Sequence, residues 1–372
     1  MKILFFFSHP AQYLFLRETI RRLAEADRHQ LVILIKTKDV LETLIRHDGL
    51  DYVNILPRYR GNSTFAVLSS LFKRLVTIIP VVLRHKPDLL IGTDATIALV
   101  GKVFGIHRIT IVEDDYEVIR KLATLTYPFT ETILCPEVCR VGPWVDKKIG
   151  YQGYMKLAYL SPSIFVPNQQ IRATHPLGNR FVLIRLSQLK AHHDTGIRGI
   201  PAELVMKMID LLESKDIDIR ISSEGELDNR FLPYALTIDP SHIHHILAQA
   251  TLLVSDSQSM SVEAAMLGIP SIRYSDFVGK ISVLEELEHT YHLTVGIRPG
   301  HETLVLDKIV EWLEQPDVNS VFLARRQTML NDKIDVTAFL VWFLDEYPAS
   351  RIAMKANPNY QNRFKLLGAL NS

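Results

Sequence analysis

The chain of 372 residues is 47% hydrophobic and 22% charged, a globular composition, and it is too long for one ordinary hydrophobic core. Its 42 Lys and Arg against 41 Asp and Glu give a net charge of +1, which argues against a globally basic nucleic-acid-binding protein. The only cysteines, Cys135 and Cys139, argue against a disulfide scaffold and a cysteine-rich zinc site, and we expect them to be structural.

The first half of the chain alternates short apolar runs with amphipathic segments. Strands are predicted over residues 2–7, 30–35, 52–56, 88–92, 108–112 and 131–134. Helices are predicted over 13–26, 39–46, 64–85 and 95–104. This alternation is typical of a doubly wound parallel sheet covered on both faces. No G-x-G-x-x-G turn follows a strand, which weighs against a dehydrogenase.

The alternation weakens from residue 151 to 179, where prolines mark a linker, and then resumes. Strands are predicted over 181–185, 218–222, 235–238, 252–254 and 269–273. Helices are predicted over 202–214, 241–250, 260–267, 279–289, 303–314, 321–330 and 336–347. The predicted fold class is therefore α/β, with two Rossmann-like doubly wound parallel-sheet domains facing across a cleft. Their expected bounds are 1–165 and 166–347, followed by a polar tail over 348–372.

The segment 251–270 combines a buried strand, a hydroxyl-rich turn and the beginning of a helix. Free N–H groups and the helix macrodipole make such a turn a binding site for an anion such as phosphate. Glu263 follows about one turn into the helix, where a carboxylate can accept hydrogen bonds from sugar hydroxyls. The alternative is a capped helix with no ligand.

Several segments resemble a known superfamily. They are 151–160, 185–196, 221–224, 244–248 and 255–270. Together they are similar to the glycosyltransferase-B (GT-B) superfamily and the related non-hydrolysing UDP-sugar 2-epimerases, and more narrowly to domain of unknown function 354. The resemblance implies that the second domain holds a nucleotide diphosphate sugar and that the first holds the acceptor and the base. The expected function is that of a glycosyltransferase with a donor that we expect to be UDP-linked, in cell-surface polysaccharide or glycoconjugate synthesis.

The resemblance also implies a set of nucleotide-sugar-binding residues. They are Arg185, Ser187, Lys190, His192, His193, Ser222, His244, Ser257, Gln258, Ser259 and Glu263. A fixed Arg or Lys can neutralise a leaving diphosphate without a metal, although the alternative for Arg185, Ser187 and Lys190 is a solvated loop. The histidines lack the spacing of a zinc site, so we expect neither a metal nor a cofactor besides the nucleotide-sugar substrate.

Three residues are candidates for proton transfer. His9 follows the first strand, where an imidazole could take a proton from an acceptor hydroxyl, or it could simply end the strand. Asp94 is either a base or the cap of the helix that begins at residue 95. Asp94 and Glu113 would be the acid and base of an epimerase or hydrolase. The chain lacks the His-Arg-Arg-Glu-Asn run of the epimerases, which weighs against that alternative. A third alternative is a nucleotide-sugar binding protein without activity.

The apolar run over 2–7 is shorter than the core of a signal peptide, so we expect a cytoplasmic protein. The segment 65–86 mixes apolar and basic residues. It could contact an anionic membrane at its inner face, where a lipid-linked acceptor would lie, or it could be a helix packed on the sheet.

Overall fold

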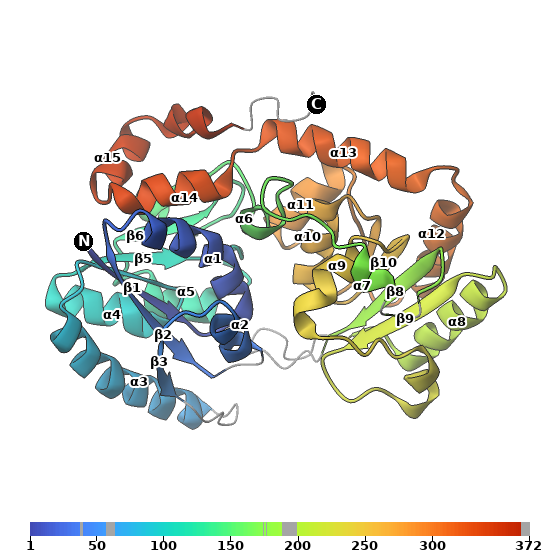
Figure 1. Ribbon diagram of the computed structural model, residues 1–372, viewed down its shortest axis with the longest axis horizontal. Helices are drawn as coiled ribbons and strands as arrows, with labels where there is room; N and C mark the ends of the chain where they lie inside the picture. The colour runs from blue at the N-terminus through green and yellow to red at the C-terminus, as the bar shows by residue number, and fades with distance from the viewer. Residues whose placement is uncertain (38–39, 57–63, 174, 176, 188–198, 366–372) are drawn as a thin grey trace. The chain divides into compact units, whose positions relative to one another are not determined.

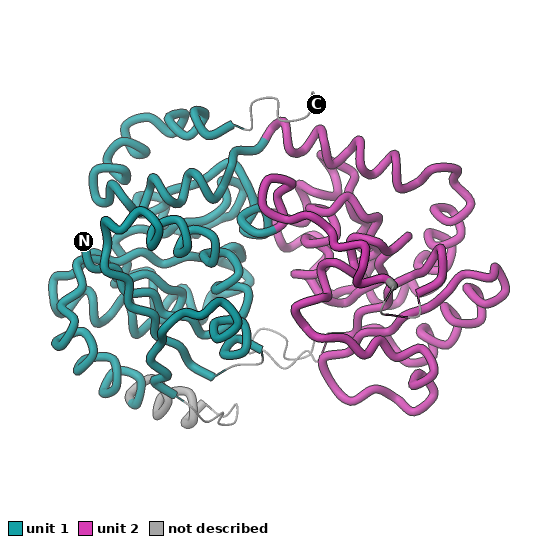
Figure 2. The backbone as a smooth tube through the Cα atoms, in the orientation of Figure 1, with its two compact units in different colours: residues 1–159, 333–372 teal, residues 160–332 magenta. Residues whose placement is uncertain are grey.

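The computed structural model describes residues 1–37, 40–56, 64–173, 175, 177–187 and 199–365, with only the backbone described for 64–72 and 173 (Figure 1). The chain divides into two compact units (Figure 2). Unit 1 comprises Met1–Tyr159 and Lys333–Ser372, and unit 2 comprises Leu160–Asp332.

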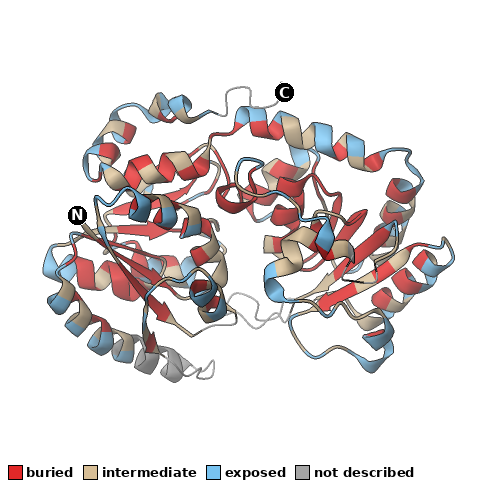
Figure 3. Ribbon diagram, viewed as in Figure 1, coloured by how far each residue is buried: buried red, intermediate tan, exposed pale blue. Residues whose placement is uncertain are grey.

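Unit 1 is built on a parallel sheet of seven strands in the order β3-β2-β1-β4-β5-β6-β7. The strands are β1 (Lys2–Phe7), β2 (Gln30–Lys36), β3 (Val53–Leu56), β4 (Leu89–Gly92), β5 (His107–Ile111), β6 (Thr132–Pro136) and β7 (Lys148–Tyr151). From Ile3 to Phe7 every residue of β1 is buried, as expected for a central strand with helices on both faces (Figure 3). Strand β7 was not predicted, because four residues are too few to give a periodic signal.

Helices cover both faces of this sheet. They are α1 (Pro10–Glu25), α2 (Leu41–His47), α3 (Thr64–His85), α4 (Ala95–Phe104), α5 (Arg120–Thr126), α14 (Val336–Asp345) and α15 (Ala349–Ala356), with the short α6 (Leu157–Leu160) at the boundary between the units. Helices α1 and α14 pack together on one face, whereas α3, α4 and α5 adjoin one another on the other (Figure 1). Two 3-10 turns, Val145–Lys147 and Pro358–Phe364, complete the unit.

The end of the chain, Lys333–Ser372, belongs to unit 1, whereas the sequence pattern predicts that the second domain extends to 347 and is followed by a tail over 348–372. The ring of Tyr151 stacks on Phe15 of α1, at 6.2 Å, and also contacts the tilted ring of Phe339 of α14, at 6.0 Å. A side chain at Gly153 would clash with Val336, so a glycine lets α14 approach the sheet. The apolar pattern predicts this helix correctly but cannot identify the sheet on which it packs.

Unit 2 contains a parallel sheet of five strands in the order β12-β11-β10-β8-β9. The strands are β8 (Phe181–Leu186), β9 (Asp218–Ser223), β10 (Leu252–Ser255), β11 (Ser271–Tyr274) and β12 (Val295–Ile297). The helices are α7 (Gln170–Ala173), α8 (Ala202–Glu213), α9 (Ile243–Leu247), α10 (Gln258–Leu267), α11 (Ser282–His289), α12 (Glu302–Glu314) and α13 (Val318–Asp332), with 3-10 turns at Asn229–Tyr234 and Pro240–His242.

The predicted fold class is confirmed, since each unit is a parallel sheet with α-helical crossovers. The strand predicted over 235–238 is reduced to a single bridge between Ala235 and Ile221. Among the described helices, none has the length and apolar character needed to cross a bilayer.

Candidate functional site

The strand order of unit 2 reverses between β8 and β10, because β9 lies on one side of β8 and β10 on the other. In open parallel sheets, ligands bind at such a switch point, beyond the carboxyl ends of the strands. Ser255, the last residue of β10, lies opposite Arg185 of β8 in the register. The structure therefore brings the predicted Arg185–Ser187 segment and the serine-rich turn to the same edge of the sheet.

The turn after β10 is held by its own hydroxyl groups. Ser255 Oγ accepts a hydrogen bond from the N–H of Ser257 at 2.8 Å, and Ser257 Oγ accepts from the N–H of Met260 at 3.3 Å. Ser257 is thus the N-cap of α10, and Gly268 ends the helix with a left-handed φ of 73°. Among the described residues, none accepts from the N–H of Gln258 or Ser259. The cap therefore does not use these two donors, which remain at the positive end of the helix, where an anion could bind.

The side chain of Gln258 points into unit 2. Its Oε1 accepts from Nη1 of Arg273 at 3.0 Å, and its Nε2 donates to Ser275 Oγ at 2.8 Å. Arg273 is completely buried, and burial lowers its pKa, opposed by Glu288 and Glu285. The predicted role of Gln258 in binding therefore rests on its backbone N–H, and its amide group positions the turn.

The positive charge of Arg185 is already paired. Its Nη2 donates to Glu224 Oε1 at 2.8 Å and its Nη1 to Ser222 Oγ at 2.6 Å. Its Nε is buried without an acceptor among the described residues. Arg185 and Ser222, two predicted binding residues, therefore lie in contact, but a diphosphate would compete with Glu224 for the guanidinium group.

Asp256 is a feature of this edge that the sequence pattern does not indicate. Its carboxylate, only 4% exposed, accepts from the N–H groups of Ser187 at 2.7 Å and of Ile200 at 3.1 Å. Burial raises its pKa, and these hydrogen bonds oppose the shift. Both partners are distant in the sequence, so only the strand order reveals the contact. Asp256 thereby binds the residue before 188–198 and the second residue after it; this segment, outside the described residues, contains the predicted Lys190, His192 and His193.

Glu263 and His244 lie together, with His244 Nε2 3.4 Å from Glu263 Oε1. They come from α10 and α9, and both were predicted to contact the nucleotide sugar. The neighbouring His245 has a structural environment instead. Its ring stacks on Phe165 at 4.8 Å and its Nδ1 accepts from the N–H of Asn168 at 3.1 Å. Burial lowers the pKa of His245, with further contributions from His244 and His242.

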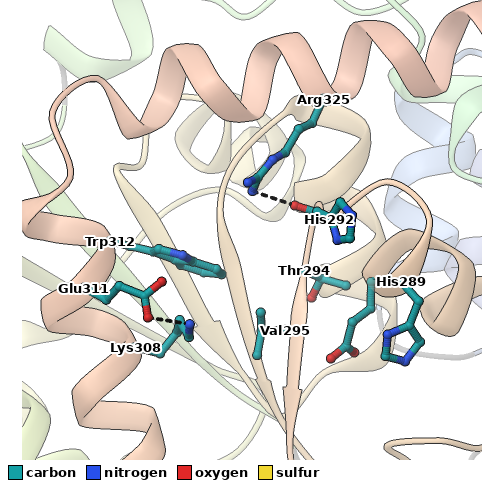
Figure 4. Close-up of a pocket in the computed structure, with 9 residues that line it drawn as sticks. His289, His292, Thr294, Val295, Lys308, Glu311, Trp312 and Arg325 are labelled. Atoms are coloured by element: carbon teal, nitrogen blue, oxygen red, sulfur yellow. Dashed lines mark hydrogen bonds and ion pairs between the residues drawn. The ribbon is translucent and has the colours of Figure 1, made fainter.

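Two pockets lie at opposite edges of the unit 2 sheet. A pocket of about 360 Å³ lies beyond β8 and β9, and its lining includes Leu186, Ser187, Val205, Ser223 and Phe231. A pocket of about 330 Å³ lies at the amino edge, where β12 begins (Figure 4). None of the predicted residues that the structure describes lines this second pocket, and its Lys308 is paired with Glu311 at 2.5 Å. The first pocket is therefore the one adjacent to the candidate site.

One group of described residues has ligand atoms close enough for a metal ion, namely Glu285, Glu288 and His289. Nη2 of Arg273 lies 3.4 Å from Glu288 and 3.6 Å from Glu285. These carboxylates therefore already balance a buried guanidinium charge, and we do not assign a metal site to them.

In unit 1 the strand order reverses between β1 and β4, which brings His9 and Asp94 to the same switch point. His9 caps α1, and its Nδ1 accepts from the N–H of Ala11 at 3.2 Å. Because Nδ1 is the acceptor, the neutral ring carries its proton on Nε2, which can donate but not accept. In this conformation Nε2 of His9 can bind a substrate oxygen but cannot take its proton.

Asp94 has the structural role that was one of its two predicted alternatives. Its Oδ1 accepts from Thr96 N at 3.0 Å and Thr96 Oγ1 at 2.6 Å, so it caps α4. Its Oδ2 lies 2.9 Å from Nη1 of Arg74. Helix capping does not prevent proton transfer, but a base at Asp94 would work against this ion pair.

Glu113 is bound to the segment 151–160 that contributed to the resemblance. Its carboxylate contacts the Nζ of Lys156 and accepts from the N–H of Met155 at 2.7 Å. Both members of the pair are largely buried. Lys156 was not singled out in the sequence, because one lysine in an apolar segment gives no indication of its partner.

Cys139 donates through Sγ to the carbonyl of Glu113 at 2.8 Å, and burial raises the pKa of Cys135 to about 12.

No model of a known protein family matches this chain, and no curated protein does. The narrower resemblance to domain of unknown function 354 therefore stays a prediction. Solved structures do share the fold. The UDP-GlcNAc 2-epimerase of Neisseria meningitidis bound to UDP-GlcNAc is 13% identical, covers 95% of this chain and 100% of its own, and has a TM-score of 0.65.

Two further structures show the same relationship. The UDP-GlcNAc 2-epimerase of Methanocaldococcus jannaschii is 17% identical over 88% of this chain and 99% of its own, with a TM-score of 0.62. The spinosyn rhamnosyltransferase SpnG complexed with thymidine diphosphate is 14% identical over 93% of this chain and 100% of its own, with a TM-score of 0.61. The chain thus has the α/β fold that epimerases and glycosyltransferases share.

Proposed function

We propose that the protein is a glycosyltransferase that takes its sugar from a nucleotide diphosphate donor, with UDP as the nucleotide, for cell-surface polysaccharide or glycoconjugate synthesis. The observation that carries this proposal is the N-terminus of α10, which presents the N–H groups of Gln258 and Ser259 at the switch point of unit 2. Backbone donors at a helix N-terminus are suited to a pyrophosphate. Similar structures named for UDP-GlcNAc and thymidine diphosphate support this choice of ligand.

In the proposed reaction an acceptor hydroxyl attacks the anomeric carbon of the sugar. The bond from that carbon to the diphosphate oxygen breaks, and its electron pair leaves with the diphosphate. The N–H groups of the α10 turn would stabilise the charge that develops there. The acceptor proton passes to a base, for which Asp94 and His9 are the candidates of unit 1; Asp94 would have to give up its ion pair with Arg74, and His9 its hydrogen bond from the N–H of Ala11.

A sugar-nucleotide epimerase or hydrolase is the second candidate. It is favoured by the acidic residues at the carboxyl edge of the unit 1 sheet, Asp94 and Glu113, and by the epimerases among the similar structures. Against it, Glu113 is tied to Lys156 and Met155, so its carboxylate would have to leave two partners to transfer a proton.

Incubation with UDP-sugars tests these proposals. We expect isothermal titration to show that UDP and a UDP-sugar bind, and we expect release of UDP from the UDP-sugar to require an added acceptor. Epimerised sugar nucleotide, detected by NMR without acceptor, would favour the second candidate. Binding without any product would indicate a non-catalytic nucleotide-sugar binding protein. Absence of binding to any nucleotide or nucleotide sugar would refute the proposal.

A further inference from the structure

Helices α3, α4 and α5 form one face of unit 1, and none of the three contains an acidic residue. The three helices adjoin one another on one side of the sheet (Figure 1). Their sequences contain no Asp or Glu, although the chain has 41 acidic residues among 372. Their Lys and Arg residues are Lys73, Arg74, Arg84, Lys102, Arg120 and Lys121. On the opposite side of the sheet, α1 carries Glu18 and Glu25, which pair with Arg21.

Most of this positive charge is exposed to solvent. Arg74 is paired with Asp94 at 2.9 Å. The other five basic side chains are exposed, and none of the residues that the structure describes forms an ion pair with them. With a net charge of only +1 for the whole chain, the positive potential of this surface reflects how the charges are arranged.

Large apolar side chains lie exposed among these charges. Val76 and Leu83 are 54% and 55% exposed, and their spacing of seven residues places them two turns apart on the same side of α3. Val103 and Phe104, at the end of α4, are 70% and 40% exposed, and Leu125 of α5 is also exposed. Single exposed apolar residues are ordinary, but a group on three adjoining helices indicates an interaction surface.

We propose that this basic face, the exposed side of α3, α4 and α5, binds the surface of an anionic lipid bilayer. Aliphatic and aromatic side chains can enter the boundary between head groups and acyl chains while basic side chains remain at the phosphates. A nucleic acid would use the charges but leave the apolar side chains in water. The contact is peripheral, because no described helix could cross the bilayer. The proposal does not depend on the proposed enzymatic function.

Flotation with lipid vesicles tests the binding. We expect the full chain to float with vesicles of phosphatidylethanolamine and phosphatidylglycerol at low salt, but not with phosphatidylcholine alone. Arg84→Gln and Lys102→Gln each remove one basic side chain, so each should lower the partition coefficient of the protein onto these vesicles by about fivefold. Val103→Asn with Phe104→Ser should lower it further. Matched controls of unit 2 and of α15, Lys207→Gln and Ile352→Asn, should have no effect.

A second measurement locates the contact without weakening it. Both native cysteines are buried, so a new surface cysteine can be labelled selectively. Val103→Cys, carrying a polarity-sensitive fluorophore, should shift its emission to the blue when anionic vesicles are added. Val166→Cys, at a position that is 75% exposed in unit 2, should not shift.

Three results would overturn the proposal. The first is that the wild-type chain does not bind anionic vesicles, or binds phosphatidylcholine equally well. The second is that the control variants reduce binding as much as the variants of the basic face. The third is that sedimentation velocity shows a dimer that Phe104→Ser abolishes in the absence of lipid, since the surface would then join two copies of this chain.

Discussion

Replacing Lys156 by Met should destabilise unit 1 strongly. The Lys156 and Glu113 side chains are only 8% and 11% exposed, and the carboxylate has Lys156 and the N–H of Met155 as its partners. Methionine fills a similar volume but leaves the carboxylate buried without its counter-charge. Breaking a buried pair in this way costs about 3–5 kcal/mol of unfolding free energy, whereas replacing both members by neutral residues costs far less.

Urea unfolding of the wild type, of Lys156→Met, of Glu113→Gln and of the double variant Glu113→Gln/Lys156→Met completes a double-mutant cycle. We expect the double variant to be more stable than Lys156→Met alone, because the amide that replaces the Glu113 carboxylate can still accept from Met155 and no charge is buried. Lys121→Met, on the exposed side of α5, serves as the control and should change stability by less than about 0.5 kcal/mol. Strictly additive losses would show that the two side chains do not interact. If the double variant folds but does not release UDP from a UDP-sugar in the presence of an acceptor, Glu113 acts in the reaction, and a structural role alone does not explain the pair.

The remaining predictions concern unit 2. Glu263→Ala should weaken UDP binding by roughly 1–3 kcal/mol in a calorimetric titration, and unchanged affinity would give Glu263 a structural role. Glu224→Gln should strengthen UDP binding, because it frees Arg185 from a competing carboxylate; weaker binding would contradict this. Burial lowers the pKa of His245 below that of the unfolded chain, so the neutral ring stabilises the fold above about pH 6.5, and this contribution is lost as the pH falls through the folded-state pKa. The stability of the wild type relative to His245→Phe should therefore fall as the pH drops below about 6.5, and a constant difference would refute the assignment.

The alternation of apolar runs and helices was sufficient to predict the fold class, because a parallel sheet requires buried strands and crossover helices whatever their partners. The same alternation did not predict how an element packs when its packing partner is distant in the sequence. Helix α14 reads as one more helix of the second domain, yet it packs on α1 and Tyr151 of unit 1. Strand β7 alternates buried and half-buried residues over only four positions, too few to give a periodic signal.

The same distinction holds for the candidate site. Residues at strand ends were placed correctly at a common edge, because strand ends in a parallel sheet share that edge. What each side chain does there was not predictable, because it depends on partners far along the chain. Gln258 turns inward to Arg273, Arg185 is paired with Glu224, and Asp256 binds the N–H of Ser187. Each of these partners is set by tertiary packing.

The charges around the α10 turn limit how a pyrophosphate could bind there. The guanidinium of Arg185 is balanced by Glu224, and that of Arg273 by Glu285 and Glu288. Asp256 adds a carboxylate that accepts from the N–H groups of Ser187 and Ile200. The described residues thus leave no surplus of positive charge, and two N–H groups at a helix N-terminus contribute only about half a charge. A bound dianion would therefore need further cations, and we propose Lys190, His192 and His193 for this role, since they lie between Ser187 and Ile200 in the sequence.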